Sequence, residues 1–129
     1  MIESIYPMLV ELKTKLAAVS GVVTCKIGLE QGIAHEDYPI VRIVPQNIGE
    51  GGSYTRRKAS VFVYFGMPID ESNDGLESVY EQLLTMESNI VKESKVFGDG
   101  WRSKYIDTVT DEDRIEIYKL MAVRLEIEG

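Results

Sequence analysis

The stretch over residues 47–66 (NIGEGGSYTRRKASVFVYFG) gathers residue types that could do chemistry. Three glycines come first and three basic residues follow them: Gly49, Gly51, Gly52, Arg56, Arg57 and Lys58. Such a stretch can cradle a phosphate, contact nucleic acid, or turn a long β-hairpin that meets another protein. The G-x-x-x-x-G-K-[ST] spacing of a phosphate-binding loop is missing, and no helix is predicted to follow. The sequence therefore favours a hairpin.

The segment over residues 70–81 (DESNDGLESVYE) is the best match to a metal-binding motif. It places oxygen-bearing side chains and a glycine where an EF-hand calcium loop has them. However, Glu77 stands where such a loop has an apolar residue, and a predicted strand ending at Pro68 replaces the entering helix. The pattern favours a turn in which Ser72 or Asp74 caps a helix, and we predict no metal site.

No residue set in the sequence predicts catalysis. His35 is the single histidine, and its neighbours Glu36 and Asp37 do not complete a metal site or an acid–base pair. The G-x-S-x-G motif is absent, as is a second histidine for a triad. Cys25, in an apolar and strand-like run, is interpreted as a packed thiol. We therefore expect a protein that is not an enzyme and uses no cofactor.

The composition is that of one folded domain over residues 1–129. Hydrophobic residues make up 44% and charged residues 27% of the chain, which is typical of globular proteins. A net charge of −7 argues against broad affinity for duplex DNA, because binding to phosphates needs clustered basic residues. No run of about twenty apolar residues exists, so we expect no transmembrane helix. The N-terminus lacks the pattern of a signal peptide, which predicts use without export.

Hydrophobic periodicity predicts the elements. Apolar residues in steps of three and four predict helices over 4–20 and 76–94. Strands are predicted over 22–29, 40–44, 58–67, 105–109 and 114–127. The strands come in consecutive groups and do not alternate with the helices. The order α-β-β-β-α-β-β therefore predicts an α+β fold, with a largely antiparallel sheet of about five strands and two amphipathic helices on one face.

The predicted strands have a second face that is also apolar. Alternation along 58–67 directs Ala59, Val61, Val63 and Phe65 to one side. The side chains expected on the other side are Phe62, Tyr64, Tyr118 and Leu120. A sheet face of this kind is too apolar to be simply solvated, which indicates subunit association. We predict these four residues as an oligomer face.

An N-terminal amphipathic helix precedes the strand YPIVRIVP and a long hairpin that ends in ASVFVYFGMP. A second helix and the segment YIDTVTDEDRIEIYKLMAVRLEIEG complete the chain. This arrangement, over nearly the whole chain, resembles the tail terminator proteins of long-tailed bacteriophages, the lambda tail terminator among them.

The resemblance implies a structural protein of the virion tail, encoded by a phage or prophage and assembled in the cytoplasm of the bacterial host. Tail terminators form a hexameric ring that caps the tail tube and stops polymerisation of the tube protein. The ring presents a surface to the head-completion or connector protein, and DNA passes through its lumen without specific binding. No membrane is involved. A six-fold ring uses a heterologous contact that closes on itself, for which an apolar sheet face and a long hairpin are suited.

In such a ring the hairpin loop is the expected partner-binding segment, with the residues Gly49, Gly51, Gly52, Tyr54, Arg56, Arg57 and Lys58. We expect the loop over 49–58 to be disordered in isolation and to order on the tube or on a neighbouring subunit. Alternatively, its basic cluster lies in the lumen near the passing DNA. Two other functions stay open: a head-completion or neck connector protein, and, in a different class, a small bacterial ligand-binding α+β domain.

Overall fold

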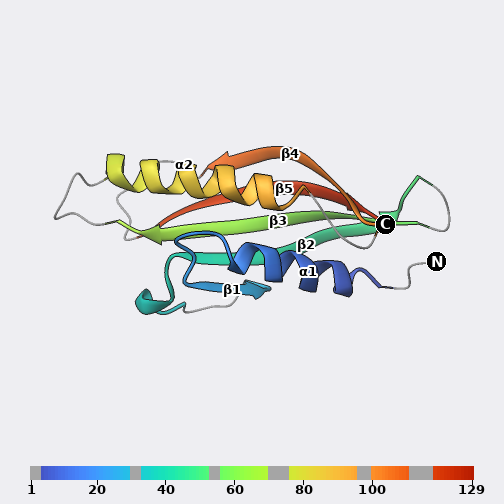
Figure 1. The fold of residues 1–129 in the computed structure, drawn as a ribbon, viewed down its shortest axis with the longest axis horizontal. Helices are drawn as coiled ribbons and strands as arrows, with labels where there is room; N and C mark the ends of the chain where they lie inside the picture. The colour runs from blue at the N-terminus through green and yellow to red at the C-terminus, as the bar shows by residue number, and fades with distance from the viewer. Residues whose placement is uncertain (1–3, 30–32, 53–55, 70–75, 96–99, 111–117) are drawn as a thin grey trace.

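The computed structural model contains two helices and one five-stranded sheet (Figure 1). It describes residues 4–29, 33–52, 56–69, 76–95, 100–110 and 118–129. The elements are α1 (Tyr6–Ala17), β1 (Thr24–Ile27), the short 3-10 helix η1 (His35–Asp37), β2 (Ile40–Glu50), β3 (Arg57–Pro68), α2 (Leu76–Glu93), β4 (Arg102–Thr110) and β5 (Tyr118–Glu128). The predicted α+β fold and element order are confirmed.

The strands lie in the order β1-β2-β3-β5-β4. β1 is parallel to β2, and every other neighbouring pair is antiparallel. The predicted hairpin of β2 and β3 is confirmed, with Ile40 opposite Gly66 and Glu50 opposite Arg57. β1 pairs with β2 only as far as Ile43. The second half of β2 is therefore a sheet edge within the described residues.

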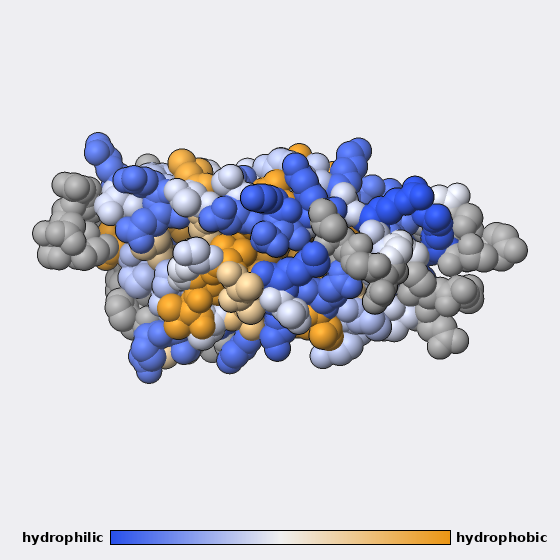
Figure 2. Space-filling model, in the orientation of Figure 1, coloured by the Kyte–Doolittle hydropathy of each residue, from blue (hydrophilic) through white to orange (hydrophobic). Residues whose placement is uncertain are grey.

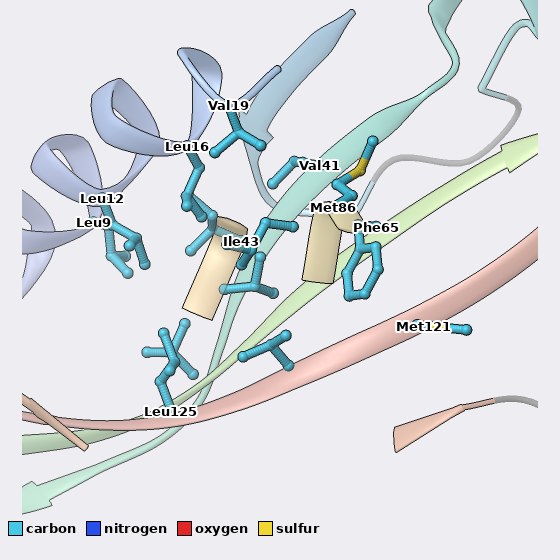
Figure 3. Packing of buried hydrophobic residues seen from close by; sticks show 14 of the residues in the cluster. Leu9, Leu12, Leu16, Val19, Val41, Ile43, Phe65, Met86, Met121 and Leu125 are labelled. Atoms are coloured by element: carbon cyan, nitrogen blue, oxygen red, sulfur yellow. The ribbon is translucent and has the colours of Figure 1, made fainter. Parts of the chain in front are cut away.

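Both helices lie on one face of the sheet, α1 over β1 and β2 and α2 over β3 and β5 (Figure 1). Leu12 and Leu16 of α1 are fully buried and point toward Val41 and Ile43 of β2 (Figure 3). Burying a leucine side chain contributes about 2 kcal/mol through the hydrophobic effect. The predicted helical stripe is thus the main contribution of α1 to the core.

Several predicted boundaries are corrected. β2 does not end at Pro45 but continues to Glu50, and its pairing with β3 shifts between Pro45 and Asn47. A proline is tolerated there because bulges and sheet edges leave backbone positions without a ladder hydrogen bond. β4 begins at Arg102, earlier than predicted, and α1 ends at Ala17. Gly21, the residue directly after the predicted helix over 4–20, lies in the following turn with a φ of 92°.

Candidate interaction surface

The sheet face opposite the helices, here called the open face, is divided by a row of irregular pairing. The row runs across the sheet through Pro45, Val61, Leu125 and Tyr105. At each end of this row one extra residue interrupts the strand pairing: Gln46 in β2 and Ile106 in β4. Bulges increase local twist and redirect side chains. Two bulges at one level therefore separate the open face into two regions.

The region toward the N-terminal end of β2, here called the apolar half, contains three of the four predicted oligomer-face residues. Phe62 and Tyr64 are half-buried, with ring centroids 5.7 Å apart. Leu120 lies against Gly66, where an added Cβ would be 2.3 Å from its Cδ2 atom. Tyr118 pairs with Pro68 through its backbone, and its side chain lies outside the described set.

The apolar half is covered on its β1 side and exposed on its β4 side. Arg42 is opposite Tyr64 in the sheet, yet its side chain is fully buried. Its Nη1 donates hydrogen bonds to the carbonyl oxygens of Thr24 at 3.1 Å and Val41 at 2.9 Å, which offsets part of the cost of burying a charge. On the β4 side, Val109 is 47% exposed. The accessible apolar surface therefore lies toward β4.

The region toward the end of the hairpin is here called the charged half. In it, acidic side chains of β5 lie between basic side chains of β3 and β4. The acidic residues are Glu126 and Glu128, and the register pairs are Lys58–Glu128, Arg102–Glu128 and Lys104–Glu126. The Lys58 ammonium is 3.0 Å from the Glu126 carboxylate, and the Arg56 guanidinium is 3.9 Å from that of Glu128. The basic cluster predicted as a partner site thus contacts acidic residues of its own chain.

The predicted loop over 49–58 is shorter in the structure. Gly49 belongs to β2, and Arg57 and Lys58 belong to β3. The Gly51 N–H donates to the Arg56 carbonyl at 2.9 Å, and the Gly52 N–H donates to the Glu128 carboxylate at 2.6 Å. The described ends of the loop are therefore hydrogen-bonded to each other and to β5, while Tyr54 lies outside the described residues.

An ion pair joins β4 to β5 at the dividing row. The Arg124 guanidinium donates through Nε and Nη2 to the two carboxylate oxygens of Asp107. These hydrogen bonds lower the pKa of Asp107 and raise that of Arg124. A shallow depression of about 190 Å³ beside the pair is lined by Gln46, Phe62 and Ile106. Since the two charges satisfy each other, the pair serves to position β4.

A hydrogen-bonded group between α2 and β4 was not predicted from the sequence. The Thr108 hydroxyl donates to the Glu87 carboxylate at 2.5 Å and lies 2.7 Å from the Tyr105 hydroxyl. Tyr105 also donates to Glu87, at 3.4 Å. These contacts fix β4 against α2. No local pattern identifies the group, because its members come from distant segments.

Lys119 interrupts the apolar alternation of β5, and the sequence suggests a sheet edge or an interface there. The structure corrects this interpretation, since β5 lies between β3 and β4 and Lys119 is buried beneath α2. Its Nζ atom is 5.2 Å from the centre of the Tyr80 ring, a cation–π contact.

The other candidate residues do not form a reactive centre within the described part of the chain. Cys25 is half-buried, its Sγ is 3.6 Å from the Lys13 carbonyl oxygen, and burial raises its pKa. No cluster of three or more metal-ligating side chains occurs among the described residues. The side chain of His35 and residues 70–75 lie outside them, so the capping predicted for Ser72 or Asp74 is not described.

A groove of about 300 Å³ lies on the helix side, between the end of α1 and α2. Pro39, Met67 and Met86 supply apolar lining, and Glu81 and Asn89 are among its polar lining. Figure 2 shows hydrophobic atoms gathered between the helices on this face. The groove could accept a small apolar group.

No protein-family model matches this chain, and no curated protein sequence matches it. Among the described residues, no helix is long and apolar enough to cross a membrane.

Proposed function

We propose that this protein is a structural component of a bacteriophage tail that assembles as a hexameric ring, caps the tail tube and ends its polymerisation. The ring would also present the surface to which the head-completion or connector protein binds. The observation that carries the proposal is the apolar half, where the half-buried rings of Phe62 and Tyr64 and the exposed Val109 lie on a sheet face that neither α1 nor α2 covers. Contiguous exposed apolar surface typically marks an interaction site.

The charged half supports the same proposal. Its acidic and basic residues come from β3, β4 and β5 and are held in register by the sheet. Exposed ion pairs add little stability, but a fixed pattern of charge orients a partner and selects against wrong ones. The hairpin end, with Arg56 and Lys58, is in this proposal the contact with the tube or with the next subunit.

The test uses the purified protein and a tail tube protein encoded in the same genome. We expect light scattering and negative-stain electron microscopy to reveal rings at high concentration or on addition of tube protein. We also expect the protein to limit the length of growing tubes. Tyr64→Lys should abolish both effects, whereas Val10→Lys, at an exposed position of α1 on the other side of the sheet, should not.

Two outcomes would contradict the proposal. Binding to the head connector with no effect on tube length would favour a head-completion protein. A strict monomer that binds a small molecule in the groove beside Met86 would favour a ligand-binding domain.

A further inference from the structure

The second half of β4 is a sheet edge without the usual protection against strand pairing. In the described part of the chain, β4 is the last strand of the sheet and pairs only with β5. Before its bulge it carries Arg102 and Lys104, and charged residues protect an edge. After the bulge it reads Asp107, Thr108, Val109 and Thr110, and Asp107 is neutralised by Arg124. An edge whose single charge is paired within the chain, and whose other three residues are β-branched, invites another strand.

Exposed apolar side chains flank this edge on both faces of the sheet. Val109 lies on the open face, opposite Ala122. On the helix side, Leu84 precedes Glu87 by three positions and so lies on the same side of α2, which contacts β4 through Thr108. α2 and β4 run in opposite directions (Figure 1). Because Leu84 comes before Glu87 in α2, it therefore lies toward the C-terminal end of β4, past Thr108.

Leu84 is 52% exposed, and Val109 is nearly as exposed. Figure 2 shows hydrophobic atoms along the upper margin of the view, on the side where α2 and β4 lie. A strand docked on β4 would contact Leu84 with one set of alternate side chains and Val109 with the other.

A second free edge lies at the opposite side of the sheet. β2 continues beyond the end of β1, and its residues from Gln46 to Glu50 are all exposed. Ile48 is 43% exposed and, being opposite Ala59, is directed to the helix side. Among the described residues no strand pairs with the outer side of this segment. An exposed isoleucine on a strand whose outer edge is free is suited to cover Leu84 of another molecule.

We infer that the free edge of β2 in one copy of the chain docks as a strand on the second half of β4 in the next copy, with Ile48 packed against Leu84. This inference rests on the proposed ring and names its subunit contact. Because β2 and β4 run in opposite directions, a rotated copy presents them as an antiparallel pair. The contact is heterologous, as a closed ring requires.

The two free edges lie at different levels of the sheet. Gln46 to Glu50 are level with the start of β4, whereas the unprotected half of β4 is level with the start of β2. If the free edge of β2 pairs with the second half of β4, each copy is therefore shifted along the strand direction relative to its neighbour. Such an offset tilts the strands relative to the ring axis, as closure of a sheet requires.

Cysteine cross-linking of the full chain in a Cys25→Ser background tests the contact. Residues directly opposite in an antiparallel pair have Cβ atoms about 4.5 to 5.5 Å apart, so a small shift brings the closer pairs to the distance of about 4.5 Å that a disulfide needs. Two double variants cover the two registers that keep Ile48 on the helix side: Ile48→Cys with Thr110→Cys, and Asn47→Cys with Val109→Cys. We expect one of them to form disulfide-linked oligomers on oxidation, and we expect no linkage in the four single variants.

Leu84→Lys and Ile48→Lys provide a second readout, because both positions are exposed and should tolerate lysine in the monomer. We expect each variant to remain folded by circular dichroism and to elute as a monomer, and Val10→Lys to assemble as the wild type does. Lysine at an exposed edge opposes strand pairing.

The outcomes separate this inference from the proposed function. Rings that assemble without a cross-link in either double variant, or that tolerate both lysines, would overturn the strand pairing and leave the ring intact. Linked linear polymers would support the pairing and contradict a closed ring. Dimers linked through Thr110→Cys or Val109→Cys alone would show β4 paired with β4, and would overturn the assignment of β2. Absence of any linked or assembled species would overturn both.

Discussion

The two halves of the open face are built from the same strands, yet they present different chemistry. In the apolar half, the half-buried side chains of Phe62 and Tyr64 of β3 lie on the same face as Leu120 of β5, and the two rings contact each other. In the charged half, the same strands present Lys58 and Glu126 to solvent as a partly exposed ion pair. The alternation of side chains continues through both regions. The change occurs at the row of bulges.

The contrast suggests that the apolar half supplies most of the affinity for a partner and that the charged half orients the partner. Removing apolar surface from water contributes about 25 cal/mol per Å², so the apolar half has the greater capacity to stabilise an assembly. An exposed ion pair contributes at most about 1 kcal/mol, and salt weakens it. We therefore expect the largest mutational effects in the apolar half and smaller, salt-dependent ones in the charged half.

Substitution of the glycine beneath Leu120 should have the largest effect. An added Cβ at Gly66 would lie 2.3 Å from the Leu120 side chain and 2.7 Å from the Lys119 carbonyl oxygen, and the backbone atom cannot move aside easily. We expect Gly66→Ala to lower the free energy of unfolding by about 3 kcal/mol, measured by urea denaturation. Gly49→Ala is the control, because its Cβ meets nothing within 4 Å and should change stability by less than about 0.5 kcal/mol. Equal effects would contradict the packing described.

Truncation of an aromatic side chain in the apolar half should have the next largest effect. Phe62 is half-buried and contacts Tyr64, so Phe62→Ala removes apolar burial and a ring contact. We expect a loss of about 2 kcal/mol in the free energy of unfolding, less than for a fully buried phenylalanine. The matched variant in the charged half is Lys104→Ala, which should cost less than about 0.5 kcal/mol in the same assay. A larger loss of stability for Lys104→Ala than for Phe62→Ala would contradict the expectation that the apolar half contributes more to stability.

Charge reversal tests the charged half. Lys58→Glu places two carboxylates next to each other and should destabilise the fold by about 1 kcal/mol. The double variant with Glu126→Lys restores an opposite pair and should recover most of that loss. Salt at about 1 M should reduce the difference between the single and double variants. A double variant no more stable than Lys58→Glu would argue that the pair does not form.

The smallest effect is expected from protonation at the dividing row. Hydrogen bonds from Arg124 lower the pKa of Asp107 in the folded state. The contribution of the pair is therefore complete above the unfolded pKa of about 3.9, and it is lost as the pH falls through the lower folded value. We expect the stability of the wild type to decrease more steeply below about pH 4 than that of Asp107→Asn, as followed by urea denaturation at several pH values. Parallel curves would mean that the carboxylate makes no folded-state contact.

The local elements of this protein could be predicted because they depend on periodicity. Leu12 and Leu16 recur at helical spacing, and Val61, Val63 and Phe65 alternate at strand spacing, so both sets identify the core directly. Both faces of β3 could be assigned in the same way, which is why Phe62 and Tyr64 were expected on the open face.

The pairing of distant segments could not be predicted in this way. Neither the position of β5 between β3 and β4 nor the extension of β2 through Pro45 has a local signal. The first places Glu126 beside Lys58, and the second creates the exposed edge at Ile48. Local side-chain spacing determined the helices, the strands and their faces. Only the tertiary structure decided which charges are paired and which edges stay free, because those depend on contacts between residues far apart in the chain.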